Sequence, residues 1–174
     1  PEFKNLDRIK KLSYLSEEHL LKIDTNMILA ILLIDDTDNF LYFCHKYKVP
    51  NSNKNKLELL SKSFQEVKED KNFFKNNLRK NTYFFGKDFL KDLAIFLFFE
   101  NKRFKYKELT SIYKDIETIS VPKFPFDGKF LKKRGFTEGK KIGLALKELE
   151  SDWVKNNYSL SEDNINSILE KVKN

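Results

Sequence analysis

The glycines of this 174-residue chain are concentrated in one short stretch. Four of the five glycines lie between Gly128 and Gly143, and the fifth is Gly86. Because glycine lacks a Cβ atom, it permits left-handed backbone and close approach of other chain segments. The stretch 124–143 must therefore turn sharply more than once. The rest of the chain, which is poor in glycine and proline, is free to form helices.

The first half of this stretch predicts a short helix with a defined start and end. Asp127 can act as its N-cap, because a carboxylate accepts hydrogen bonds from the free amides of a first turn. The helix would run through Phe130, Leu131 and Lys132. Gly135 then stands where a helix favours a left-handed residue after its last turn.

The second half predicts another helix, which begins at Thr137 or Gly139. Its apolar residues recur at the spacing of one helical face: Ile142, Leu146, Leu149 and Trp153. Gly143 lies among them, and we expect the backbone of a neighbouring segment to pack closely against it. Lys140 and Lys141 stand at the free amides of the helix N-terminus, where a phosphate is favourably bound.

The same pattern also has a purely structural explanation. A glycine-bounded helix connection flanked by lysines occurs in helical proteins that contact no nucleic acid. The helix-hairpin-helix motif of DNA-binding proteins has two glycines two residues apart, whereas Gly135 and Gly139 lie four residues apart. This spacing counts against that motif.

The stretch nevertheless carries an ordered set of residues: Phe124-Pro125, Gly128, Leu131, Gly135, Gly139, Ile142-Gly143, Leu146, Leu149 and Trp153. This set resembles the C-terminal signature of the bacterial-type (class II) tRNA nucleotidyltransferases, the CCA-adding enzymes, which are grouped with bacterial poly(A) polymerases. Further blocks are similar to the same family: Asp24 to Ile34, Val49 to Asn53, and Leu78-Arg79, Tyr83, Gly86, Phe89 and Asp92. Two residues depart from the family pattern, since Phe130 stands where Asp is frequent and Lys140 where many members have Pro.

The resemblance implies an all-α fold, a compact multi-helix bundle that corresponds to the body and tail of a class II enzyme. Residues 1–120 would form the RNA-binding helical body, and residues 121–174 the tail with the proline and glycine block and the last two helices. The α/β catalytic head of the family would be absent, so the chain would be a fragment. The complete protein would transfer CMP and AMP from CTP and ATP onto tRNA 3′ ends with Mg²⁺, and this chain itself would hold no cofactor.

The resemblance further implies that this region holds tRNA by shape and by backbone charge. The expected contacts to tRNA phosphates are Lys129, Lys132, Lys133, Arg134, Gly139, Lys140 and Lys141. The formal net charge of +7 permits such binding. It is weak evidence by itself, because only four of the 33 basic residues are arginines, a bias that an AT-rich genome produces whatever the function.

Apolar periodicity and capping residues predict helices along the rest of the chain. They are expected over residues 5–15, 26–34, 38–49, 72–85, 87–100 and 106–119. Ser16 can cap a further short helix through Ile23, a long helix follows Ser52 and runs to about Asp70, and Ser161 caps the last helix. The helix over 87–100 is apolar nearly all round and is the expected core helix. We find no strand pattern, repeat or Gly/Ser linker, and we place the only subdivision near Ser120.

The run Asp35-Asp36-Thr37-Asp38 contains an Asp-x-Asp pair, which nucleotidyltransferases use to hold Mg²⁺. In that fold the pair lies on a strand after a glycine turn, whereas here it joins two helical runs with no glycine near. We therefore interpret the carboxylates as caps for a helix that begins at Asp38. No metal site is expected in this chain.

Other candidate catalytic residues have simpler explanations. His19 and His45 lack ligand spacing and are expected at the surface or half-buried. Cys44 is the only cysteine, which excludes an internal disulfide, and its apolar neighbours indicate a buried thiol. Trp153 can stack on a base but belongs first to the core.

No export signal or membrane span is visible, so the expected location is the cytoplasm. Two alternative functions remain open. One is the same region of a poly(A)-adding polymerase, and the other is a helical protein-interaction module. The sequence carries no signal for an oligomeric state.

Overall fold

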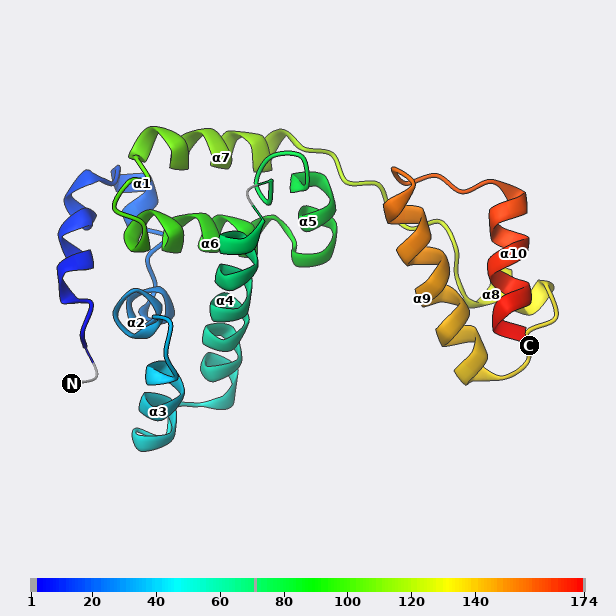
Figure 1. Cartoon of the computed structure of the whole chain (residues 1–174), viewed down its shortest axis with the longest axis horizontal. Coiled ribbons are helices and arrows are strands. Elements are labelled where there is room, and N and C mark those ends of the chain that lie inside the picture. The colour runs from blue at the N-terminus through cyan, green and yellow to red at the C-terminus, as the bar shows by residue number, and fades with distance from the viewer. Residues whose placement is uncertain (1–2, 71, 174) are drawn as a thin grey trace. The chain divides into compact units, whose positions relative to one another are not determined.

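The computed structural model describes residues 3–70 and 72–173. These residues form helices joined by turns and extended connections, and none of them lies in a strand (Figure 1). The all-α fold expected from the sequence is thereby confirmed. The chain divides into two compact units, Pro1–Ser120 (unit 1) and Val121–Asn174 (unit 2).

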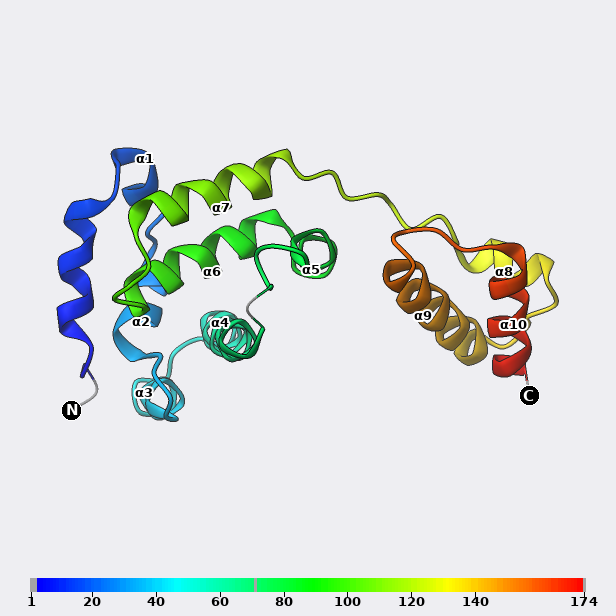
Figure 2. The same cartoon turned by 45° about the horizontal axis from the view of Figure 1, so that its top comes forward.

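Unit 1 is built around one central helix. Its elements are a 3₁₀ helix η1 (Leu6–Tyr14), α1 (Glu17–Leu20), α2 (Thr25–Leu33), α3 (Asn39–Lys46), α4 (Asn51–Glu69), α5 (Leu78–Phe85), α6 (Lys87–Glu100) and α7 (Tyr106–Thr118). Helix α6 packs along α7 and also contacts η1, α2, α4 and α5 (Figures 1 and 2). The long first helix expected from the amphipathic pattern is thus a 3₁₀ helix.

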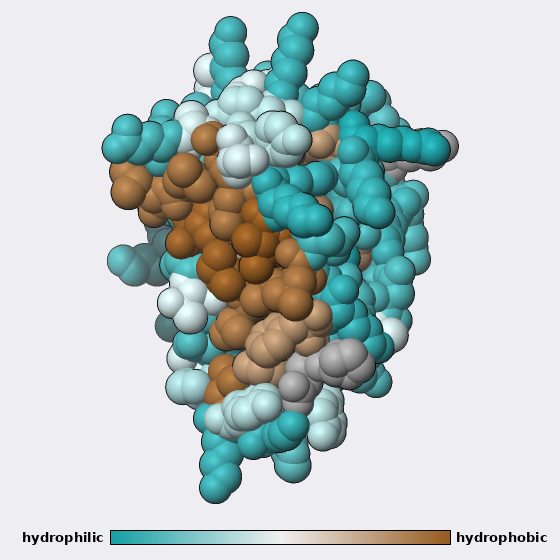
Figure 3. All heavy atoms as spheres, turned by 90° about the vertical axis from the view of Figure 1, so that its left-hand side faces the viewer, coloured by the Kyte–Doolittle hydropathy of each residue, from teal (hydrophilic) through white to brown (hydrophobic). Residues whose placement is uncertain are grey.

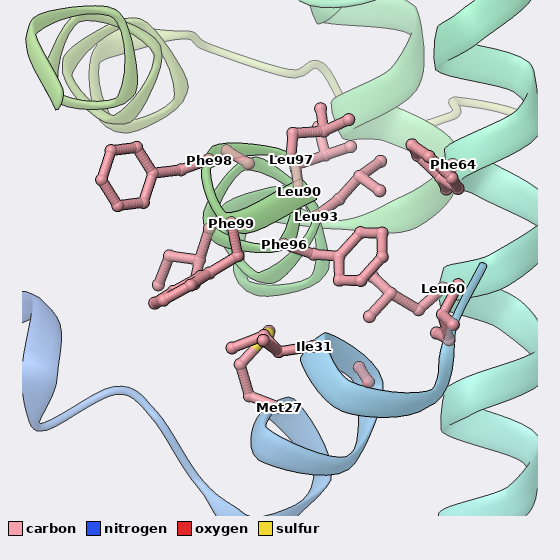
Figure 4. Packing of buried hydrophobic residues seen from close by; sticks show 14 of the residues in the cluster. Met27, Ile31, Leu60, Phe64, Leu90, Leu93, Phe96, Leu97, Phe98 and Phe99 are labelled. Atoms are coloured by element: carbon pink, nitrogen blue, oxygen red, sulfur yellow. The ribbon is translucent and has the colours of Figure 1, made fainter. Parts of the chain in front are cut away.

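The sequence of α6 explains its central position. Every residue from Leu93 to Phe99 is buried, so the helix needs neighbours on all sides. Phe96 lies edge-on against Phe64 of α4, with ring centroids 5.2 Å apart (Figure 4). Phe99 points instead toward Ile31 of α2. Burial of each such side chain contributes about 1.5–3 kcal/mol to the stability of unit 1.

Basic side chains of η1 bind the free carbonyl groups at two helix ends. Arg8 donates to the carbonyl oxygens of Ile31 and Ile34 at 3.1 and 2.8 Å. Lys11 donates to the carbonyl oxygen of Asn101 at 2.8 Å, just beyond the end of α6. Since the last carbonyls of a helix lack intrahelical partners, these cations fix η1 to α2 and α6.

The helix expected over residues 72–85 begins only at Leu78, because polar side chains hold the preceding segment in a turn. The Asp70 carboxylate accepts from the Asn72 amide at 2.8 Å and from Asn77 Nδ2 at 2.7 Å. Asn81 Nδ2 donates back to the Phe73 carbonyl at 2.9 Å. Such side-chain bonds compete with helix formation.

The segment after Ser16 also differs from its expected helix, since α1 ends at Leu20 and not at Ile23. Ser16 Oγ lies 2.9 Å from His19 Nδ1 and caps no helix amide. His19 is only 7% exposed, which corrects the expectation of a surface or half-buried side chain. His45 is exposed, and Cys44 is buried as expected, with burial raising the pKa of its thiol.

Unit 2 consists of α8 (Gly128–Lys133), α9 (Gly139–Lys155) and α10 (Glu162–Lys173). Helix α9 packs against both α8 and α10. Its core contains Leu131, Phe136, Ala145, Leu149, Ile165, Ile168 and Leu169. Trp153 is buried between the rings of Phe124 and Tyr158, at centroid distances of 5.4 and 4.9 Å, so its assignment to the core is confirmed.

One face of unit 1 is rich in apolar side chains. Figure 3 shows them gathered on the side that carries η1. Exposed apolar residues of the N-terminal elements include Leu6, Leu20 and Leu21. A patch of this kind is typical of a contact with another polypeptide. No helix within residues 3–70 and 72–173 combines the length and the apolar character needed to cross a bilayer.

Candidate nucleic-acid interface

The start and the end of α8 are set by the residues that the sequence indicates. Asp127 Oδ1 accepts a hydrogen bond from the Phe130 amide at 2.8 Å, which confirms the N-cap. Gly135 has φ +88°, and its amide donates to the Lys132 carbonyl at 3.1 Å. The Phe136 amide donates to the Leu131 carbonyl at 3.1 Å. This pair of bonds is a Schellman motif, and it places Phe136 in the core beside Leu131.

Three lysines share the solvent face of α8. Lys129, Lys132 and Lys133 are spaced three and four residues apart, which puts them on one side of a helix. All three are exposed, whereas Leu131 is fully buried on the other side. Within the described residues, no ion pair or hydrogen bond engages their ammonium groups. The short helix therefore presents three mobile positive charges to solvent.

The N-terminus of α9 lies beyond the Gly135 turn. Gly139 is its first residue, and no atom lies within 4 Å of the place that a Cβ would take there. Lys140 is exposed in the first turn, while Lys141 donates to the Lys173 carbonyl at 3.1 Å. The free amides of this first turn are hydrogen-bond donors at the positive end of the helix dipole.

Arg134 is engaged within unit 2. Its guanidinium donates to Glu162 Oε2 and to Asn166 Oδ1, both at 2.9 Å, and lies 4.5 Å from the centroid of the Phe130 ring. Glu162 and Asn166 belong to α10, so the side chain ties α8 to α10. The Phe130 ring thus supports this guanidinium.

Lys173 lies on the same surface, although no local sequence pattern points to it. Its Nζ donates to the Arg134 carbonyl at 3.0 Å and lies 5.2 Å from the centroid of the Phe136 ring. A cavity of about 240 Å³ is lined by Gly135, Phe136, Thr137, Glu138, Lys141 and Lys173. Lys173 reaches the Gly135 turn because α10 packs against α9.

Gly143 does not have the role expected from its position. It lies exposed inside α9, and no atom is within 4 Å of where its Cβ would be. No backbone approaches it, so the expectation of a close helix contact is wrong. The apolar neighbours Ile142 and Leu146 face the core, and Gly143 points elsewhere.

The surface between Gly128 and Lys141 carries mainly basic side chains. Between Gly128 and Lys141 the chain has six basic residues and a single acidic one, Glu138. Most of the charged side chains there are lysines, whose exposed ammonium groups suit the binding of phosphates.

The Asp35–Asp38 run serves the turn between α2 and α3. Asp35 Oδ1 accepts from the amide and the hydroxyl of Thr37, at 2.8 and 2.5 Å. Asp36 pairs with Lys68 of α4, and hydrogen bonds from Lys68 and Gln65 lower the pKa of its carboxyl. No group of three or more metal-ligating side chains occurs among residues 3–70 and 72–173.

The expected capping role of Asp38 is wrong. Its side chain accepts no cap hydrogen bond from α3. The Thr37 hydroxyl accepts from the Asn39 amide instead, at 3.3 Å. Thr37 can cap α3 because its hydrogen bonds to Asp35 already fix its side chain in the turn before the helix.

Comparison with known proteins finds one matching family and several relatives. Residues 21–169 match the family described as tRNA nucleotidyltransferase domain 2. A 65-residue segment is 38% identical to the CCA tRNA nucleotidyltransferase 1, mitochondrial, of Danio rerio, covering 37% of this chain. Segments of 68 residues are 34% and 33% identical to the proteins of the same name in Mus musculus and Homo sapiens, covering 39% of this chain.

The aligned segments span only 15–16% of the length of these relatives. No solved structure matches the chain. The family match is much longer than the pairwise ones and extends through both units, from Leu21 to Leu169. On this evidence the chain belongs to the tRNA nucleotidyltransferase domain 2 family.

Proposed function

We propose that this chain is the tRNA-holding helical region of a CCA-adding tRNA nucleotidyltransferase. The family match supports the class of protein, and the relatives are named as CCA tRNA nucleotidyltransferases. The proposed RNA contact is the lysine surface, which we define as Lys129, Lys132, Lys133, Lys140 and the first-turn amides of α9. Arg134 and Lys141 stand beside it but are engaged within unit 2.

The observation that carries this proposal is a contrast between two kinds of basic side chain: some bond to other residues of unit 2, and others project into solvent. Arg134 bonds to α10, whereas the four lysines of the surface project into solvent around the Gly135 turn. Double-helical RNA is recognised mainly through its phosphates, its 2′-hydroxyls and its shape. Flexible ammonium groups on a firmly packed helix pair match such a target, because each can follow the path of the phosphate backbone.

The chemistry of nucleotide addition is assigned to a catalytic head elsewhere in the complete protein. That reaction implies Mg²⁺ with CTP and ATP, and the described residues do not fit a Mg²⁺ site. No group of three or more metal-ligating side chains occurs among them, and Asp35 Oδ1 and Asp36 Oδ1 accept hydrogen bonds from Thr37, Lys68 and Gln65. The proposed contribution of this chain is to hold tRNA in place.

The test is a matched pair of double charge reversals in the same unit. The first variant combines Lys132→Glu with Lys133→Glu, and the second combines Lys155→Glu with Lys171→Glu, two exposed lysines outside the lysine surface. Binding of labelled tRNA is measured at several salt concentrations. The first variant should bind at least about tenfold more weakly, with a salt slope shallower by about two units.

The control variant has the same change in net charge and should retain nearly wild-type binding. Equal loss in both variants would show that only overall charge matters. Unchanged binding in the first variant would leave the helical protein-interaction module as the better description. The poly(A)-adding alternative is separated by the complete protein, which should extend a tRNA that lacks its 3′ end with CTP and ATP together and add no long tail with ATP alone.

A further inference from the structure

A cavity lies in unit 1 where α2, α4 and α6 meet. These three helices contact one another, and each of them supplies part of the cavity wall. The volume of the cavity is about 240 Å³. Pockets for drug-sized ligands usually measure about 300–1,000 Å³, so only a smaller molecule would fit here.

The wall of this cavity is mainly apolar. Met27 of α2 and Leu57 and Leu60 of α4 line it and are buried. Figure 4 shows Met27 and Leu60 on their two helices. Phe89 of α6 completes the wall, and its ring stacks on that of Phe85 with the centroids 5.5 Å apart. A ligand therefore needs an aliphatic part that covers these side chains.

Two carboxylates line the same cavity and are exposed to solvent at its mouth. Asp24 is held in place as the N-cap of α2, since its Oδ1 accepts from the Met27 amide at 2.7 Å. Its Oδ2 accepts from Asn26 Nδ2 at 3.2 Å. Asp92 extends from α6, and its carboxylate has no hydrogen bond or ion pair with any of residues 3–70 and 72–173. The mouth thus offers hydrogen-bond acceptors to a ligand.

Negative charge predominates around the Asp92 carboxylate. Partial burial raises the pKa of this carboxyl, and the negative charges of Asp24 and Asp88 raise it further. Lys56, which also lines the cavity, acts in the opposite direction. Its ammonium group is exposed and forms no ion pair within the described residues. A positive charge between the two lining carboxylates would therefore be stabilised.

We propose that this cavity binds a small aliphatic amine. The ammonium group would lie between the Asp24 and Asp92 carboxylates, and the carbon chain would lie against the apolar wall. An ammonium group suits carboxylates that come from two different helices, because its three N–H donors point in separate directions. This ligand goes beyond the proposed function, which involves the lysine surface of unit 2.

The test measures the binding of n-pentylamine to the complete 174-residue chain by ligand-observed NMR titration at about pH 7, where the amine is protonated. n-Pentanol has the same carbon chain without the charge. Pentylamine should bind at least about tenfold more tightly than pentanol, because hydrogen bonds between charged groups are stronger than those of a neutral hydroxyl. Equal affinities would show that only the apolar wall binds and would overturn the proposal.

The variant Asp92→Asn removes one carboxylate and keeps the shape of the side chain. Its matched control is Asp88→Asn, which removes the same charge one turn earlier on α6, at a residue outside the cavity wall. Asp92→Asn should weaken pentylamine binding at least about tenfold, and Asp88→Asn less than about threefold. Equal losses in the two variants would mean that no direct contact with Asp92 exists.

Lys56→Gln tests the sign of the charge that the cavity favours. This variant should bind pentylamine about twofold to threefold more tightly, because a repelling ammonium group is removed. Weaker binding would show that Lys56 attracts the ligand, which contradicts an amine. Far-UV circular dichroism of each variant checks that the helices are retained.

The lysine side chain of another polypeptide carries the same ammonium group on a similar carbon chain. Nα-acetyl-lysine N-methylamide represents this source and is titrated beside pentylamine. Weaker binding of the lysine compound supports a free amine, since its peptide groups do not fit the small cavity. Tighter binding would assign the cavity to a lysine side chain and overturn the free amine. These titrations contain no RNA, so their outcome is independent of the tRNA-binding test.

Discussion

At the scale of single residues, α3 ends in the same Schellman motif as α8, since the Lys48 amide donates to the His45 carbonyl and the Val49 amide to the Cys44 carbonyl. The two motifs differ in one respect. Gly135 ends α8 without strain, whereas Lys48 ends α3 with a side chain in the left-handed region. A left-handed residue with a Cβ costs roughly 1–2 kcal/mol, and part of this cost is offset because glycine loses more chain entropy on folding. We predict that Lys48→Gly raises the free energy of unfolding by about 0.5–1 kcal/mol.

Urea denaturation followed by circular dichroism measures this effect. Gly135→Ala is the reciprocal variant and should destabilise the protein, because it places a Cβ at φ +88°. A destabilised Lys48→Gly variant would show that the lysine side chain itself holds the end of α3.

The buried His19 predicts a dependence of stability on pH. Burial lowers the pKa of this imidazole, and the nearby Lys22 ammonium lowers it further, while Glu18 acts in the opposite direction. The folded state therefore prefers neutral His19, whose Nδ1 lies 3.0 Å from the Tyr106 hydroxyl. Stability from this group is fully present above its unfolded pKa of about 6.5 and is lost as the pH falls.

We expect the melting temperature to fall between about pH 7.5 and about pH 5.5, and to fall less in His19→Gln. His45→Asn is the control, because that histidine is exposed and makes no comparable contact. An identical pH dependence in the wild type and His19→Gln would assign the effect to carboxylates instead.

At the scale of elements, Arg134 connects α8 with α10 in unit 2. Arg134→Ala removes its pair with Glu162, its bond to Asn166 and its contact with Phe130. Exposed ion pairs contribute up to about 1 kcal/mol and cation–π contacts about 0.5–1 kcal/mol, so we expect a loss of about 1–2 kcal/mol. The measurement is urea unfolding followed by fluorescence of Trp153, the single tryptophan, which is buried in unit 2.

Lys133→Ala is the matched control, since its ammonium group bonds to no described residue. A loss of similar size in both variants would mean that the helix propensity of α8, and not the Arg134 contacts, was changed.

The elements also show what the sequence could predict. The structure confirms the Asp127 cap of α8 and the apolar core helix α6, whereas the expected cap at Asp38 is wrong. The turn over Asn72–Asn77 could not be predicted, because the Asn77 and Asn81 side-chain amides and the Asp70 carboxylate form bonds that no periodicity reveals.

The candidate site was predictable only in part, for a related reason. The sequence showed the lysines around Gly135 and Gly139, but not which cations are already engaged. Arg134 bonds to residues 28 and 32 positions away, and Lys173 reaches Arg134 across 39 positions. Such distant pairs follow from the packing of α10 and leave no local pattern.

At the scale of the whole molecule, the buried apolar residues form two separate clusters, one in each unit. Phe96→Ala in unit 1 should cost about 3–5 kcal/mol, because it leaves a cavity beside Phe64. We predict that this variant shifts the main transition seen by circular dichroism and leaves the Trp153 fluorescence transition unchanged. Leu149→Ala should have the opposite pattern. A common shift of both signals would show that the units unfold together.

The burial of Cys44 simplifies the labelling of this protein with fluorescent dyes. Its sulfur is shielded by the core of unit 1, and burial keeps the thiol in its unreactive protonated form. Dyes coupled through maleimide will therefore attach to newly introduced surface cysteines without removal of the native one. A donor on one unit and an acceptor on the other would then measure, molecule by molecule, the separation of the two units with and without added RNA.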